Sequence, residues 1–229
     1  ALAGLLGALV ALAIASRLRP RRIVYSVRDR AYFRQGRRLT DGQIREIIFA
    51  EQQRNAMRFR RRTQALIDGS IGFDRWQDDM ARDIIRSHFR MSQAGAGGAS
   101  RLTPDHLQRL RDNLRDELQY FQGFADDLAN GRISEKMALH RAGRYGNSSG
   151  SSYYAAEQVN YGDGWLAWRR LDPNANHCPD CPGLVTDGWV LASQVVPVGM
   201  QCRCRGNCKC RVQYRRRQQV NLSDRLQTG

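Results

Sequence analysis

The cysteines carry the clearest chemistry of this sequence. All six lie in the last quarter of the 229-residue chain. A Cys-Pro-Asp-Cys knuckle comes first, and two Cys-x-Cys pairs follow about twenty residues later. A knuckle followed at this distance by a second cysteine cluster is typical of a small hairpin closed by a metal ion or by disulfides. The positions are Cys178, Cys181, Cys202, Cys204, Cys208 and Cys210.

Four thiolates fill the tetrahedral coordination shell of zinc, so a site of this kind is structural and leaves no position open for a substrate. Disulfides between the two clusters are the alternative, because a Cys-x-Cys pair cannot easily bond to itself, and free thiols are a third reading. A reducing compartment favours the metal. The expected ligands are the knuckle and the last pair, with one substitute from the middle pair and the adjacent histidine as a further candidate: Cys178, Cys181, Cys208, Cys210, then Cys204, then His177.

The excess positive charge lies near the two ends of the chain. The net charge is +15, yet residues 39–200 hold 20 basic and 20 acidic residues. Residues 17–38 carry nine arginines and one acid, and residues 203–217 carry seven basic residues and no acid. Basic arms of this kind are typical of proteins that bind nucleic acid or an acidic partner. The expected contact residues are Arg17, Arg19, Arg21, Arg22, Arg28, Arg30, Arg34, Arg37, Arg38, Arg203, Arg205, Lys209, Arg211, Arg215, Arg216 and Arg217.

Residues 1–16 are apolar and small. As a helix they would span about 24 Å, short of a bilayer core of about 30 Å. Their charges follow the apolar run, whereas a signal peptide has them before it. We expect a helix that docks on another protein subunit, or one that meets a membrane only transiently. The basic arm behind it is expected to be extended, with its aromatic residues anchoring it to neighbouring elements.

The rest of the sequence predicts a mainly α fold: a multi-helix body, a small Cys-rich C-terminal hairpin and extended basic arms. Helix starts are expected at Thr40, whose spacing to Gln43 is that of a capping box, at Thr103-Pro104, and at Ser134. A Ser/Gly-rich loop over 148–152 and a strand from Trp165 should lead to the knuckle. The expected organisation is 1–38 apolar helix and basic arm, 39–92 helical subdomain, 93–100 linker, 101–164 helical subdomain, 165–214 Cys-rich hairpin and 215–229 tail. An ordered loop between antiparallel helices is the alternative for residues 93–100.

Several motifs resemble those of the Mu F-like phage minor head proteins, also called head morphogenesis proteins. The resemblance covers roughly residues 115–212, and Cys202 is a departure from the family pattern. The motifs are Glu-Leu-x-Tyr-Phe-x-x-Phe-Ala at the start of 117–131, Ser-Glu with Arg-Ala-x-x-Tyr in 134–145, Arg-Arg-x-Leu leading to His-Cys-x-x-Cys in 169–181, Gly-Trp at 188–189, Pro-x-Gly at 197–199 and Cys-x-x-Asn-Cys-x-Cys in 204–210.

This resemblance implies a virion structural protein inside the capsid at the portal vertex, present in several copies and made in the host cytoplasm. Its expected partners are the portal protein, other head or neck proteins, and the double-stranded DNA genome. Ejection with the genome is one alternative, and membrane contact would then belong to that step. A zinc-knuckle nucleic-acid-binding module acting in packaging or head assembly is the second reading of the sequence.

An enzyme is not expected. Catalysis needs acid, base or metal groups that converge on one site. The histidines are scattered and share no motif: His88, His106, His140 and His177. The sequence contains no Gly-x-Ser-x-Gly, no His-Glu-x-x-His and no phosphate-binding Gly loop.

Overall fold

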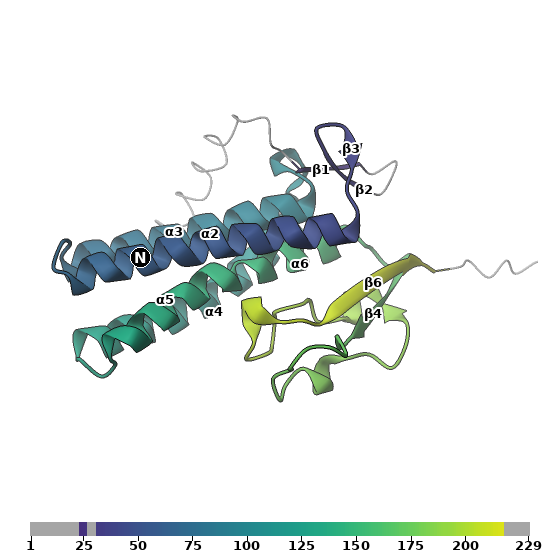
Figure 1. Ribbon diagram of the computed structural model, residues 1–229. Helices are drawn as coiled ribbons and strands as arrows, with labels where there is room; N and C mark the ends of the chain where they lie inside the picture. Colours follow the sequence, from purple (N-terminus) through teal and green to yellow (C-terminus); the bar gives the residue numbers. More distant parts are fainter. Residues whose placement is uncertain (1–22, 27–30, 218–229) are drawn as a thin grey trace, which may run out of the picture.

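The computed structural model describes residues 23–26 and 31–217, which form an N-terminal three-stranded antiparallel sheet, a helical body and a small C-terminal sheet (Figure 1). The strands of the N-terminal sheet are β1 (Ile23–Ser26), β2 (Ala31–Arg34) and β3 (Arg37–Arg38). The helices are α2 (Asp41–Ile67), α3 (Phe73–Ala96), α4 (Pro104–Ala129), α5 (Glu135–Ser148) and α6 (Gly150–Val159). The sheet strands are β4 (Trp165–Arg170), β5 (Val190–Leu191) and β6 (Arg211–Arg216), and the 3-10 turns are η1 (Ala99–Arg101), η2 (Pro182–Leu184), η3 (Ala192–Gln194) and η4 (Arg205–Asn207). The expected mainly α fold with a Cys-rich C-terminal part, residues 165–214 and called the cysteine module below, is confirmed.

The helix starts follow from local capping chemistry. Thr40 accepts a hydrogen bond from the backbone N–H of Gln43, and the Gln43 side chain accepts one from the Thr40 backbone. This capping box satisfies two of the donors that an N-terminus leaves free. Thr103 and Ser134 cap α4 and α5 in the same way, through their side-chain oxygens. All three predicted helix starts are confirmed.

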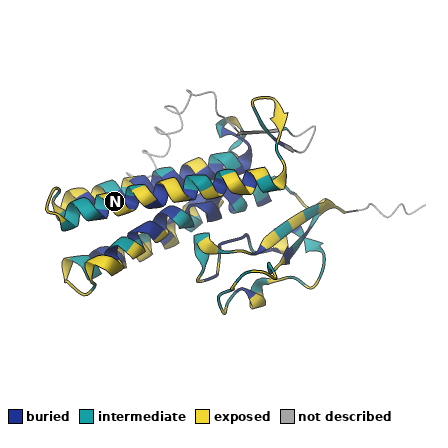
Figure 2. Cartoon of the chain, viewed as in Figure 1, coloured by how far each residue is buried: buried dark blue, intermediate teal, exposed yellow. Residues whose placement is uncertain are grey.

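The helices bury one shared aromatic core. Trp76 of α3 is fully buried between Phe121 and Phe124 of α4, and its indole N–H donates to Thr63 of α2 at 3.2 Å. Tyr145 of α5 stacks on Phe124. Figure 2 shows the buried residues on the helix faces that meet. The two helical subdomains expected from the sequence therefore contribute to a single core.

The linker expected over residues 93–100 is wrong for residues 93–96, which are helical. Residues up to Ala96 continue α3, which ends only at Gly97 in a left-handed conformation. A Cβ on Gly95 would lie 2.2 Å from the carbonyl oxygen of Tyr153 in α6. The small residues here therefore permit close contact between α3 and α6, and do not form a flexible linker.

The expected Ser/Gly loop over 148–152 is also helical. Side-chain hydroxyls bond back to preceding carbonyls, Ser148 to Tyr145 and Ser151 to Ser148. A Cβ on Gly150 would lie 2.2 Å from the amide nitrogen of Gln52. The Ser/Gly composition thus allows α6 to lie close to α2 with only a break at Ser149.

Part of the N-terminal basic arm forms the N-terminal three-stranded sheet. Its Tyr32 is buried beside Tyr153, and the Tyr32 hydroxyl donates to the carbonyl of Gly95 at 2.6 Å. An anchoring role for this aromatic residue is as expected. Among the described residues, no helix is both long and apolar enough to cross a membrane. The apolar stretch 1–16 and the arginines at 17, 19, 21, 22, 28 and 30 lie outside the described residues.

The C-terminal sheet has the order β5-β4-β6, with both pairings antiparallel. Ala167 and Arg169 of β4 are buried on the inner face. Trp168 and Arg170 face the other side, because side chains alternate along a strand. As predicted, β4 delivers the chain to the cysteine knuckle.

Candidate metal centre and its docking surface

Four sulfur atoms lie close together in the cysteine module. The knuckle turn brings Cys178 Sγ within 3.5 Å of Cys181 Sγ, and the returning chain places Cys204 Sγ 3.5 Å and 3.3 Å from these two. Cys202 Sγ lies 3.3 Å from Cys204 Sγ. The four ligand atoms all lie within 4.8 Å of one another, so this group can hold a metal ion.

The spacing of the sulfurs fits coordination better than cross-linking. All six cysteines are free thiols. The S···S separations of 3.3–3.5 Å far exceed a disulfide bond of about 2.05 Å. A tetrahedral site with metal–sulfur bonds of about 2.3 Å separates its sulfurs by about 3.8 Å. The disulfide alternative is therefore not what the structure shows.

The group differs from the expected ligand set at two positions. Cys178, Cys181 and Cys204 belong to it, and Cys202 takes the fourth place. The last pair lies beside it: Cys208 Sγ is 3.9 Å from Cys181 Sγ, and Cys210 forms a second group with Cys181 and His177. The turn at Gly199, where φ is +82°, brings Cys202 and Cys204 back over the knuckle before η4 begins.

A buried arginine completes the surroundings of the sulfurs. Arg169 is 0% exposed, and its guanidinium donates to the carbonyls of Val196 and Pro197 and lies 3.9 Å from Cys208 Sγ. Burial lowers the pKa of Arg169, but the sulfurs of Cys210, Cys208 and Cys202 together outweigh burial and raise this pKa. No carboxylate forms an ion pair with Arg169 within the described ranges. Thiolates therefore supply the negative charge that a buried guanidinium needs.

The thiols ionise unequally. A side-chain hydrogen bond from Cys202, with the backbone N–H groups of Cys210 and Gly199, lowers the pKa of Cys208 to about 4. Burial opposes ionisation at Cys178, yet backbone N–H groups bring its pKa down to about 7. Burial raises the pKa of Cys181 to about 12. A bound cation removes this obstacle, because it stabilises several neighbouring thiolates at once.

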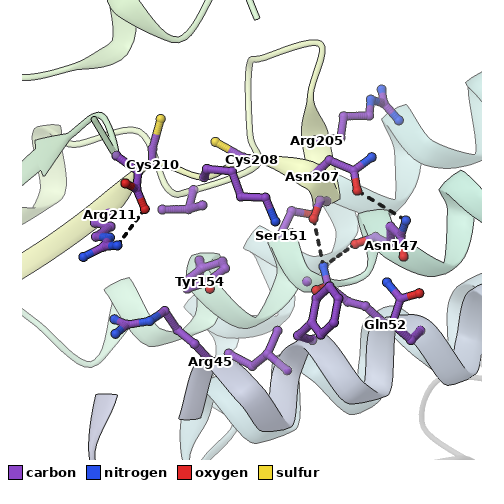
Figure 3. A pocket seen from close by; sticks show the side chains of 18 residues that line it. Arg45, Gln52, Asn147, Ser151, Tyr154, Arg205, Asn207, Cys208, Cys210 and Arg211 are labelled. Carbon is purple, nitrogen blue, oxygen red and sulfur yellow. Dashed lines mark hydrogen bonds and ion pairs between the residues drawn. The ribbon is translucent and has the colours of Figure 1, made fainter. Parts of the chain in front are cut away.

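The turn η4 docks the cysteine module on the helices. Gln52 of α2 donates to the carbonyl oxygens of Asn147 and Gly206, and Asn147 donates to Asn207 (Figure 3). A Cβ on Gly206 would lie 1.8 Å from the Asn147 carbonyl oxygen. Only glycine allows this approach of two backbones.

A buried ion pair adds to the docking. Glu117 of α4 is 3% exposed and accepts from both Arg205 and Ser148. The Arg205 guanidinium also lies 3.8 Å from the ring centroid of Tyr120. Burial raises the pKa of Glu117, and Arg205 and Ser148 oppose that rise. The pair joins residues 88 positions apart and fixes η4 on α4.

Replacing Gly206→Ala is expected to separate the module from the helical body, because the added methyl cannot avoid the Asn147 backbone. We expect a loss of about 3 kcal/mol or more, comparable with overpacking and loss of a buried hydrogen-bond network. Hydrogen exchange should show increased exchange at 205–207 and at 147–150. Gly183→Ala in the same module is the control, since a Cβ there meets nothing within 4 Å; equal exchange in both variants would contradict the docking role of Gly206.

The expected contact residues in the described part of the chain differ in their contacts. Arg203, Arg205 and Arg211 form ion pairs, with Asp180, Glu117 and Asp172 respectively. Lys209 lies over the ring of Phe49 and Arg215 over that of Trp189. Arg216 and Arg217 are exposed at the end of β6. The expected contact residues in the N-terminal sheet are Arg34, Arg37 and Arg38.

Two pockets flank η4, and both are rich in basic side chains. One, of about 210 Å³, lies between α2 and the module and includes Arg45, Lys209 and Arg211 (Figure 3). The other, of about 370 Å³, lies over α4 and α5 and includes Arg144 and Arg203. These pockets bring part of the C-terminal positive charge together with arginines of the helical body.

The sequence did not single out Cys202, Arg169, Glu117 or Gly206 as site residues. Glu117, Arg169 and Gly206 do lie within the motifs quoted above, which is the signal that could have found them. His88 is fully buried, and its Nδ1 lies 2.9 Å from the Ser152 hydroxyl. The sequence did not indicate this contact. Burial, then Arg205, lowers the pKa of His88 to about 3, so it is a neutral core residue.

The candidate site consists of the cysteine cluster, the buried guanidinium of Arg169 and the contact of Gly206 with Asn147. These lie within residues 147–210 and the helices that they contact. No protein-family model, no curated protein and no solved structure matches this chain.

Proposed function

We propose that this chain is a structural protein of a phage head, similar to the Mu F-like minor head proteins, with a zinc-bound C-terminal module. The observation that carries the proposal is that residues from different quoted motifs contact one another in the structure. Glu117 begins one motif, Arg205 lies in another, and the two form the buried ion pair that docks the module. Arg169 of a third motif contacts the cysteines. The residues behind the resemblance thus support a common architecture.

Zinc is the metal that the ligands favour. A closed set of thiolate ligands suits a borderline-soft ion without redox chemistry. Its role would be structural, because the module has a small core that needs an additional constraint. Cys181 and Cys202 are buried and their side chains are enclosed by the same module.

The location at the portal vertex, inside the capsid, is part of the same proposal. The helical body pairs many of its arginines with acids, for example Arg62 with Asp79 and Asp83. The C-terminal strand instead ends in exposed arginines. Such a surface suits packaged double-stranded DNA or an acidic portal surface.

Mass spectrometry of purified particles of the encoding phage, intact and after DNA release, tests this proposal. We expect the chain in intact particles at a few copies per head. Its loss on DNA release would mean that it leaves with the genome, and its retention would mean a fixed part of the portal vertex. Absence from both would contradict the virion proposal and favour the second candidate.

The second candidate is a nucleic-acid-binding module acting in packaging or head assembly. One face of the C-terminal sheet favours it. The guanidinium of Arg170 lies 4.4 Å from the Trp168 ring centroid, and that of Arg215 lies 4.2 Å from the Trp189 ring centroid. Guanidinium groups held over aromatic rings keep N–H groups that can contact the phosphates of a nucleic acid.

Replacing Arg170→Gln and Arg215→Gln together is expected to weaken binding to a double-stranded DNA fragment of random sequence. Each lost phosphate contact should reduce the slope of log K against log salt by about 0.9, so we expect a reduction of about 2. Fluorescence anisotropy over a salt series measures it. Arg109→Gln with Arg115→Gln on α4 is the charge-matched control. Equal slopes for the two double variants would exclude the sheet face as the DNA-binding surface.

A further inference from the structure

The cysteine module contains two Cys-x-Cys pairs but only one knuckle. Both pairs reach that knuckle. Cys204 Sγ lies 3.3 Å and Cys208 Sγ 3.9 Å from Cys181 Sγ, on the two sides of η4. Cys181, which is 0% exposed, also belongs to both groups of metal-ligand atoms. One metal ion with four ligands would leave the second pair unused beside it.

His177 is oriented as a ligand in the second group. Its Nε2 lies 2.8 Å from the backbone carbonyl oxygen of Asp172. A carbonyl can only accept, so Nε2 carries the proton and Nδ1 presents a lone pair. That Nδ1 is buried and makes no hydrogen bond with any described residue. A metal-bound histidine shows this arrangement, with its other ring nitrogen donating to a carbonyl.

A ring nitrogen of His177 lies with Cys181 Sγ and Cys210 Sγ in a group whose ligand atoms are all within 4.8 Å of one another. Because Nε2 is bonded to the Asp172 carbonyl, Nδ1 is the nitrogen with a lone pair for a metal ion. Cys208 contacts Cys210 and Cys181 and is the remaining thiol next to this group. One imidazole and three thiolates form a closed tetrahedral ligand set of the type that zinc takes.

We propose that the module binds two metal ions that share the Cys181 thiolate. The first is held by Cys178, Cys181, Cys202 and Cys204, and the second by His177, Cys181, Cys208 and Cys210. This inference rests on the zinc binding of the proposed function and adds a second ion to it. Six thiolates and two divalent ions leave a charge of −2, and the buried Arg169 guanidinium beside Cys208 offsets part of it.

Metal content and native mass spectrometry of the full chain, purified with zinc, test the stoichiometry. We expect two zinc ions per chain. His177→Ala removes a ligand of the second ion only and should lower the content to one. His140→Ala is the matched control, since this exposed histidine of α5 lies outside the module, and it should keep two.

A cadmium titration of the unmodified metal-free chain gives an answer that does not depend on how any variant folds. Thiolate-to-cadmium absorbance should rise until two equivalents are bound, and ¹¹³Cd NMR should show two resonances, one of them shifted by a nitrogen ligand. Saturation at one equivalent, with His177→Ala unchanged, would overturn the second site while leaving the first. No metal in a folded chain would instead remove the zinc proposal itself.

Discussion

Replacing Cys178→Ser and Cys181→Ser together is expected to unfold the cysteine module and leave the helices folded. Both sulfurs belong to the four-sulfur group, so the variant loses half of those ligands. The apolar residues that surround the sulfurs are few, chiefly Val198, Leu171 and Val212. In small metal-bound domains the free energy of metal binding is most of the free energy of folding.

Limited proteolysis measures this effect. We expect rapid cleavage within 165–215 in the double variant, while far-UV circular dichroism keeps most of its helical signal because the Trp76 core lies outside the module. Val185→Ser, at an exposed position of the same module, is the control and should remain resistant. A chelator should make the unmodified chain resemble the double variant. Unchanged protease resistance of the double variant would rule out a stabilising role for the knuckle.

The helix starts and the strand before the knuckle could be predicted because they depend on local chemistry. Capping by Thr40 or Thr103 needs only residues within one turn of helix. The pattern of apolar residues in α4 also specifies which face is buried, including Leu110 and Phe121. These features are encoded within short stretches of sequence.

The ligand set could not be ranked in the same way. The two Cys-x-Cys pairs have the same spacing and each encloses one basic residue, Arg203 or Lys209. Which pair reaches which side of the knuckle depends on the turn at Gly199 and on the docking of Gly206 against Asn147. These are tertiary contacts, and sequence spacing does not contain them.

The small residues of 93–100 show the same limitation. Glycine and alanine are common both in flexible linkers and where two helices come close. The close approach of Gly95 to the Tyr153 carbonyl shows that these small residues serve a close contact between helices. This contact joins positions far apart in the sequence. Composition alone therefore gave the wrong structure for residues 93–96.

Replacing Arg205→Met is expected to destabilise the docked structure by about 3–5 kcal/mol, because it leaves the buried Glu117 carboxylate without its counter-charge. The contact of the guanidinium with Tyr120 is lost as well. Urea unfolding followed by the change in tryptophan fluorescence measures the loss. Arg203→Met is the control, because its ion pair with Asp180 has a 73% exposed arginine side chain and should contribute less than about 1 kcal/mol.

The pH dependence identifies the cause. The pKa of Glu117 in the folded chain is already above its unfolded value, so its protonated form favours folding and its contribution is lost as the pH rises through the folded pKa. Removing Arg205 takes away the interaction that lowers this pKa, so the variant should lose more stability as the pH rises above the usual carboxyl range. Glu117→Gln in the Arg205→Met background replaces the buried carboxylate by a neutral group and should abolish that additional pH dependence. If Arg205→Met lost the same stability at every pH, the effect would come from packing against Tyr120 and not from the uncompensated charge of Glu117.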